Sequence, residues 1–164
     1  MAIKKTSKEE ILQESIKLFK QKGYYNCSMA NIADACGLIK GSIYHYFKSK
    51  DEIGLESLKY IHNYFVDNIF SIAYDKNLKD EEKIKLIVKK TDEYFLNSKG
   101  GCLLGNLALE VSSENVEFQE VIKEYFTAWE NALVNIFKNK YDESKARDIA
   151  KEYVALIQGS IMMM

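Results

Sequence analysis

Residues 28–47 constrain the fold more than any other part of the sequence, because they specify two short helices joined by a tight turn. Ser28 can cap the first helix by accepting a hydrogen bond from a free backbone N–H group, and Ile32 and Cys36 share one face of that helix. Gly37 follows the last turn, where the backbone needs a left-handed conformation that glycine adopts without steric penalty. The segment therefore predicts a helix-turn-helix.

The helix after this turn has an apolar side and a polar side. Leu38, Ile43 and Tyr46 form the apolar side, which we expect to pack on the first helix. The outward side carries donors and rings suited to phosphate, namely Lys40, Ser42, Tyr44 and His45. Helix pairs of this kind place their second helix in the major groove of DNA, although similar pairs also occur in all-helical proteins that bind no DNA.

A more specific pattern covers Lys40 to Glu52, which read Lys-Gly-Ser-Ile-Tyr-His-Tyr-Phe-Lys-Ser-Lys-Asp-Glu. This run resembles the segment that closes the DNA-binding domain of TetR-family transcriptional regulators. The resemblance implies an all-α fold, with a DNA-binding domain at residues 1–48 (its motif at about 29–48) and a helical ligand-binding and dimerisation domain at residues 49–164. It also implies phosphate contacts from Ser28, Lys40, Ser42, Tyr44, His45 and Lys50, with close approach of the backbone at Gly41.

One position departs from the family pattern. Ile39 stands where a serine or threonine usually caps the recognition helix and donates to a phosphate, and isoleucine can do neither. Either a neighbouring group takes over or the protein holds its operator less firmly. Arg147 is the only arginine and lies far from the motif, so an arginine-to-guanine contact cannot form here. We expect Lys40, Ser42 and Tyr44 to read an AT-rich operator, together with thymine methyls and DNA shape.

Composition agrees with an all-helical fold, since 47% of the 164 residues are hydrophobic, proline is absent and no long alternating run predicts a strand. No stretch approaches the ~20 apolar residues of a membrane span, and the first residues lack the apolar run of a signal peptide. We therefore expect a cytoplasmic protein. The three cysteines are odd in number and lack metal-ligand spacing, so we assign no metal and no cofactor.

The charge is divided unevenly along the chain. Residues 1–50 hold nine lysines against four carboxylates, a net of +5, so the remainder carries −6 of the total of −1. A basic head favours contact with a polyanion, whereas an acidic body avoids non-specific attachment to the same DNA. Lys4 and Lys5 precede the first predicted helix as a short basic arm, which either lies along phosphates or is disordered.

Caps and apolar spacing predict the other helices. Ser7 with Glu10 forms a capping box, and the helix that it starts ends at Gly23. Ser49 with Glu52 forms a second box, which starts a helix running to about Tyr74. Further helices are predicted at roughly 80–98, 102–111, 115–140 and from 144 onward, with a break at Gly100 and Gly101.

Aromatic residues recur along the helices of the body. In the family the body encloses the inducer pocket, and the resemblance makes seven residues candidate lining: Tyr64, Tyr94, Phe95, Asn106, Tyr125, Phe126 and Trp129. An aromatic stripe at helical spacing is also the pattern of an ordinary core. His62 faces either this pocket or solvent.

Cys102 is the sharpest chemical feature outside the head. It follows Gly100-Gly101 at a predicted helix N-terminus, where free N–H groups and the helix dipole lower the pKa of a thiol. The surrounding Gly-Cys-Leu-Leu segment resembles that of a TetR subgroup in which some members sense electrophiles or oxidants through this cysteine. Cys102 is therefore a candidate thiol sensor, with an inert buried thiol as the alternative.

The chain ends in a predicted helix whose apolar face includes Leu156 and Ile161, followed by Met162 to Met164. TetR-family regulators dimerise through their last two helices, and only the first of that pair is evident here. A C-terminally truncated domain, a chain with a further tail and a short variant would all have this pattern. Self-association would cover the apolar residues.

The expected function is a homodimeric, ligand-responsive transcriptional regulator, a repressor released from a near-palindromic DNA operator by a small molecule or an electrophile. Two alternatives remain. One is a thiol-dependent enzyme with Cys102 as nucleophile, for which no base can be assigned. The other is an adaptor of the same fold that has lost DNA binding, which Ile39 alone supports.

Overall fold

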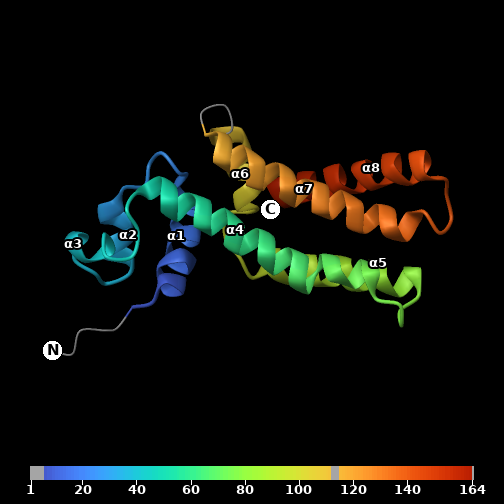
Figure 1. Cartoon of the computed structure of the whole chain (residues 1–164), viewed down its shortest axis with the longest axis horizontal. Helices are drawn as coiled ribbons and strands as arrows, with labels where there is room; N and C mark the ends of the chain where they lie inside the picture. The colour runs from blue at the N-terminus through green and yellow to red at the C-terminus, as the bar shows by residue number, and fades with distance from the viewer. Residues whose placement is uncertain (1–5, 112–114, 164) are drawn as a thin grey trace.

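The computed structural model describes residues 6–111 and 115–163, and these residues form helices and the turns between them (Figure 1). A small head holds α1 (Lys8–Lys22), α2 (Met29–Ala35) and α3 (Lys40–Ile43), and α4 (Lys50–Asn68) leads from it into the body. The body adds the 3₁₀ helix η1 (Phe70–Tyr74), α5 (Asp80–Leu96), α6 (Leu103–Glu110), α7 (Val116–Phe137) and α8 (Glu143–Met162). No strand occurs in the two described ranges, and the predicted all-α architecture is confirmed.

Predicted caps define the helices of the head. Ser7 Oγ accepts from the Glu10 N–H (3.1 Å) and the Glu10 carboxylate accepts from the Ser7 N–H (3.0 Å), so the first capping box is confirmed. Ser28 Oγ accepts from the Asn31 N–H (3.2 Å) at the start of α2. Gly37 has a φ of 67°, which confirms the left-handed turn between α2 and α3. The basic arm with Lys4 and Lys5 lies outside the described residues.

The second predicted box is only half formed. Ser49 Oγ caps α4 by accepting from the Glu52 N–H (3.1 Å). The Glu52 carboxylate accepts instead from the N–H of Lys48 (2.6 Å), one residue before the expected donor.

The predicted end of this helix at Tyr74 is wrong, because α4 ends at Asn68 and η1 follows as a separate helix. Asn68 Nδ2 donates to Tyr64 O (2.9 Å), and Ser71 Oγ donates to Asp67 O (2.8 Å). Such side-chain bonds compete with the backbone for the last carbonyls of a helix. The chain therefore turns at Ile69 rather than continuing straight.

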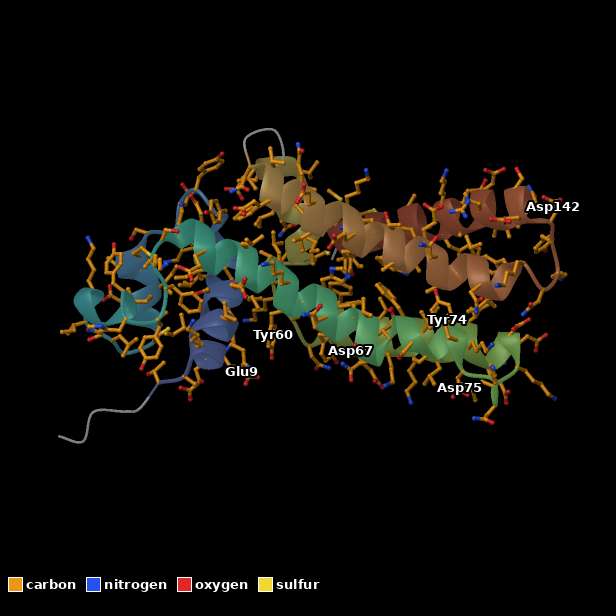
Figure 2. All side chains as sticks on the ribbon, in the orientation of Figure 1. Glu9, Tyr60, Asp67, Tyr74, Asp75 and Asp142 are labelled. Atoms are coloured by element: carbon orange, nitrogen blue, oxygen red, sulfur yellow. The ribbon has the colours of Figure 1, made fainter. Side chains whose placement is uncertain are left out.

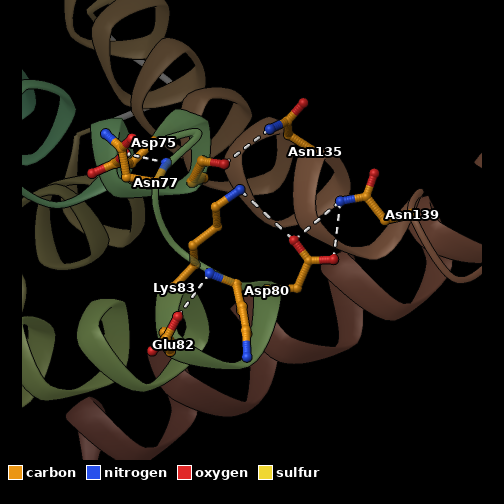
Figure 3. Close-up of polar contacts among 9 residues, drawn as sticks. Asp75, Asn77, Asp80, Glu82, Lys83, Asn135 and Asn139 are labelled. Atoms are coloured by element: carbon orange, nitrogen blue, oxygen red, sulfur yellow. Dashed lines mark hydrogen bonds and ion pairs between the residues drawn. The ribbon is translucent and has the colours of Figure 1, made fainter.

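The body is built around α7, which packs against α4, η1 and α8. Its buried face carries ten residues, among them Tyr125 and Trp129, which are fully buried. At the end away from the head, polar bonds fasten the other elements to α7 (Figure 3): Asn135 Nδ2 donates to Ala73 O of η1 (3.0 Å), and Asn139 Nδ2 donates to the Asp80 carboxylate of α5 (3.0 and 3.1 Å). These bonds fix the start of α5.

The C-terminal end of α8 returns to the middle of the molecule, close to α6 (Figure 1). Ile161 is buried there beside Gly101, and Gln158 lies against Gly105 of α6. Met164 lies outside the described residues. Within the described ranges, no helix combines the length and the apolar character needed to cross a bilayer.

Head and body meet around Tyr24, in the loop after α1. Its ring lies 5.2 Å from the Phe19 ring of α1 and 5.4 Å from the Phe118 ring of α7 (centroid distances). Gly54 of α4 faces both Tyr24 and Phe118, and a Cβ atom there would lie 2.9 Å and 2.5 Å from their rings. Only glycine lets α4 pass this close to the two rings.

Substituting Gly54→Ala should lower the free energy of unfolding by about 1–3 kcal/mol, because the added methyl group overpacks a rigid aromatic contact. Urea denaturation of the pure protein measures the change. Gly41→Ala is the matched control, since a Cβ at Gly41 meets no atom within 4 Å. Equal stability of the two variants would show that the close approach at Gly54 is dispensable.

Candidate functional site

The predicted recognition helix is short, since α3 ends at Ile43 and Tyr44 and His45 lie in the turn after it. Together, α3 and this turn form a solvent-exposed surface at the outer end of the head (Figure 1). Ile43 is completely buried and anchors α3 on the head, which leaves Lys40, Gly41, Tyr44 and His45 exposed and Ser42 half-buried. Ser28, at the start of α2, is also exposed. Six of the seven predicted DNA-contacting residues are thus accessible without any change in the fold.

Lys50 differs from these six residues. Its Nζ donates to the Tyr24 carbonyl oxygen (3.0 Å) and lies 4.2 Å from the centroid of the Tyr24 ring. The side chain is half-buried and belongs to the contact between head and body. Its charge still lies in the head, but the structure holds its ammonium group on the protein rather than at the open surface.

Ile39 precedes α3 with an extended backbone and is 77% exposed. No side-chain hydrogen bond caps this helix. The first N–H groups of α3 are consequently open to solvent or to an acceptor such as phosphate. Since α3 spans four residues, a missing cap affects most of the helix.

Glu110, at the end of α6, links body to head. Its carboxylate accepts from the backbone N–H groups of Tyr24 (2.9 Å) and Tyr25 (2.8 Å). The Tyr24 hydroxyl donates to Asp51 of α4, and burial together with this carboxylate raises the pKa of the phenol. Sequence reasoning missed Glu110 and Tyr24, because these contacts join residues 86 and 27 positions apart and leave no local pattern.

A second link joins α4 to the first half of α1. The Tyr60 hydroxyl of α4 donates to Glu9 Oε1 (3.1 Å), and Gln13 Nε2 donates to the Tyr60 oxygen (3.2 Å; Figure 2 labels Glu9 and Tyr60). The head is therefore held to α4 along much of α1.

Most of the predicted pocket residues lie in one cluster of aromatic rings. Neighbouring ring centroids are 5.0 Å apart for Tyr94 and Phe95, 5.2 Å for Tyr125 and Phe126, and 5.9 Å for Tyr125 and Trp129. Tyr64 joins at the edge and is 42% exposed, with its ring 5.4 Å from that of Tyr94. The cluster spans α4, α5 and α7.

The sequence prediction left out one residue of this cluster and wrongly included another. Phe65 lies at its centre, with ring centroids 4.8 Å from Tyr94 and 5.4 Å from Tyr125. The predicted lining residue Asn106 lies elsewhere, where its Nδ2 donates to Gly100 O (2.9 Å). The half-buried His62 faces the cluster, with its ring 6.3 Å from that of Tyr125.

Two buried polar atoms on the helices of this cluster, Thr91 Oγ1 of α5 and Trp129 Nε1 of α7, have no hydrogen-bond partner among the described residues, while the Tyr125 hydroxyl has the Cys102 thiol as a neighbour. Each is fully shielded from solvent. Buried donors without partners cost free energy, and a ligand that supplied an acceptor would offset that cost.

Cys102 lies at the start of α6, as predicted, and its Sγ accepts from the Gly105 N–H (3.4 Å). The prediction of a lowered thiol pKa is wrong for this fold. Cys102 is 2% exposed, and burial raises its pKa more than the backbone N–H groups of Gly105 and Leu104 lower it. The thiol is therefore in its protonated, less nucleophilic form.

Among the residues that the structure describes, no three histidine, cysteine, aspartate or glutamate side chains gather closely enough to hold a metal ion.

A helix-turn-helix head carried on a larger helical body is the architecture of a DNA-binding transcriptional regulator. Residues 7–56 match the family model for bacterial regulatory proteins of the tetR family, and residues 81–164 match the C-terminal domain of LmrA/YxaF-like transcriptional regulators. The chain belongs to the TetR family.

Individual relatives agree with this assignment. The uncharacterised HTH-type transcriptional regulator YxaF of Bacillus subtilis is 29% identical over 161 residues, which cover 96% of this chain and 84% of YxaF. The icaADBC negative regulator IcaR of Staphylococcus epidermidis is 24% identical over 133 residues, or 79% of this chain and 69% of IcaR. A TetR regulator structure from Legionella pneumophila has a TM-score of 0.87 and 25% identity, covering 99% of this chain and 88% of that one.

Replacing Ile39 by threonine should supply the missing cap and raise the free energy of unfolding by about 0.5–2 kcal/mol. Ile39→Val is the matched control, because valine has the shape of threonine without its hydroxyl group. Chemical denaturation of both variants gives the comparison. The cap argument is refuted by a threonine variant no more stable than the valine variant.

Replacing Glu110 by alanine should leave the Tyr24 and Tyr25 N–H groups without their acceptor and cost about 1–3 kcal/mol. Amide hydrogen exchange measures the effect residue by residue, and protection should fall first at these two amides. Glu110→Gln keeps one carbonyl acceptor and should lie between the wild type and the alanine variant. Unchanged exchange in Glu110→Ala would contradict a role for this carboxylate in holding the head.

Proposed function

We propose that this protein is a cytoplasmic, homodimeric, ligand-responsive repressor that grips a near-palindromic operator mainly through phosphates. One observation carries the proposal: Lys40, Gly41 and Ser42 of α3 and Tyr44 and His45 of the turn that follows it are accessible, while Ile43 holds the helix on the head. An ammonium, hydroxyl groups and an imidazole on one surface suit phosphate oxygens. The name of IcaR as a negative regulator supports repression rather than activation.

The dimer would form through α8. Its outward face carries exposed apolar residues that a lone protomer leaves in water, namely Tyr153, Leu156, Met162 and Met163. Pairing of this face between two copies would bury them. Two heads related by a two-fold axis then read half-sites centred about 34 Å apart or a multiple of it.

The effector would bind at the aromatic cluster. Tyr64, Tyr94, Phe95, Tyr125, Phe126 and Trp129 supply its apolar walls, and Asn106, which donates to Gly100 O, is left out of the proposed lining. The hydroxyl of Tyr125, beside Cys102, and the unpaired indole N–H of Trp129 offer directional contacts. A ligand that separates these rings displaces α4 or α7, and both contact the Tyr24 junction.

A sensor role for Cys102 is a further proposal, linked to the Gly-Cys-Leu-Leu subgroup by residues 101–104. Burial of the thiol disfavours reaction in this conformation, so an electrophile would have to reach it in a more open one. The same burial argues against the thiol-dependent enzyme, since a nucleophile needs access to its substrate.

Gel-shift titrations with the DNA upstream of its own gene test the main proposal. Binding should prefer that sequence and weaken steeply with salt. Lys40→Ala should reduce the slope of log affinity against log salt by about 0.9, the value for one lost phosphate contact. Lys59→Ala is the control, because Lys59 lies on α4 and pairs with Glu56 (3.0 Å). Sequence-independent binding, or equal slopes for both variants, would refute the phosphate-reading head.

A further inference from the structure

Lys20 places a positive charge inside the protein. It belongs to α1 of the head but is only 8% exposed, because its side chain runs into the body at the end of α5. Its Nζ donates to Ser98 Oγ and lies 5.6 Å and 5.9 Å from the ring centroids of Tyr94 and Phe95. Ring faces attract a cation but do not neutralise it.

No carboxylate lies within ion-pair distance of Lys20 in the part of the chain that the structure describes. Cys102 is the nearby group that could carry a negative charge, yet its burial favours the neutral thiol. Burial also lowers the pKa of Lys20, as expected for an ammonium group removed from water. A buried ammonium without a counter-charge is costly, and an anion beside it would offset that cost.

A cavity of about 370 Å³ adjoins this charge. Its walls come from the end of α5, the glycine turn and the end of α8, and they comprise Phe95, Leu96, Ser98, Lys99, Gly100, Gly101 and Ile161. Ser98 both lines the cavity and accepts from Lys20, so the ammonium lies directly behind the wall. Phe95, Leu96 and Ile161 give the cavity an apolar side.

The lining carries the positive charge of Lys99 and no carboxylate. Lys99 in the lining and Lys20 behind Ser98 bring positive charge to the cavity. The other lining residues contribute apolar side chains or the backbone of the two glycines. The volume falls within the range of small-molecule sites.

We propose that the effector is a carboxylate with an apolar tail, which binds in this cavity with its charged group on Ser98 and Lys20. The inference rests on the proposed ligand-responsive function. It moves the ligand from the centre of the aromatic cluster to the cavity at its edge, where Phe95 belongs to both, and it adds the chemical class of the ligand and the place of its charge. Lys20 is thereby a specificity-determining residue, and it belongs to the head rather than to the body.

The position of Lys20 connects ligand and head directly. Gly100 packs against the same residue so closely that a Cβ atom would lie 2.5 Å from the Lys20 carbonyl oxygen. A carboxylate that draws the ammonium towards the cavity acts on α1 without an intermediate element. This route is separate from the Glu110 contact, because Lys20 lies in α1 and Glu110 accepts from the loop after it.

Isothermal titration calorimetry of the full chain with hexanoate and with hexanamide tests the proposal. The two probes match in size and differ in charge. Hexanoate should bind at least about tenfold more tightly, as a charge-assisted hydrogen bond requires. Equal affinity for the two probes, or no hexanoate binding at millimolar concentration, would overturn the proposal without any variant.

Variants at Lys20 locate the charge. Lys20→Met should abolish the preference for hexanoate, and Lys20→Arg should retain most of it. Lys17→Met is the control, because Lys17 lies on the same helix with its side chain 62% exposed. Unchanged preference in a folded Lys20→Met protein would place the anion elsewhere.

Gel shifts separate this inference from the proposed function. If the unliganded protein fails to bind DNA but still prefers hexanoate, the repressor proposal fails and the anion site stands. If DNA binding is sequence-specific but the probes bind equally, only the anion site is lost.

Discussion

The close packing of Gly54 against Tyr24 and Phe118 is the contact on which the rest of this structure depends. Helix α4 belongs to both halves of the molecule, since it packs on α1 of the head and on α7 of the body. At Gly54 it passes two rings that a methyl group would displace. A well-packed contact of this kind transmits a shift instead of absorbing it, because protein interiors have little free volume.

Polar bonds around Tyr24 give this apolar contact a single geometry. The Tyr24 backbone N–H points to Glu110 of α6, its carbonyl accepts from Lys50, and its hydroxyl donates to Asp51. Apolar packing alone tolerates sliding, whereas hydrogen bonds fix direction. Movement of α6 or α4 therefore changes the orientation of the loop that precedes α2, and with it the position of α3.

Most of the helices could be predicted from local signals in the sequence. Contacts between residues that are distant in the sequence could not be predicted. Ser7, Ser28 and Gly37 act within three or four positions of themselves, so their caps and turn could be read from the sequence. The exposed side of α3 followed from helical periodicity. The link from Glu110 to Tyr24 depends on packing across 86 positions, and the pKa of Cys102 depends on burial that outweighs its helix N-terminus.

The free energy needed for regulation is small compared with the free energy that the hydrogen bonds around Tyr24 contribute. Allosteric coupling is typically 1–3 kcal/mol, and one hydrogen bond to a charged acceptor contributes about 1.5–3 kcal/mol. Loss or distortion of a single bond from Glu110 is therefore enough to separate two positions of the head. A ligand in the body need not unfold or rebuild any helix. An effector shifts an equilibrium only by its difference in affinity for the two states, so a ligand that favours one position of the head by the free energy of one such bond is sufficient.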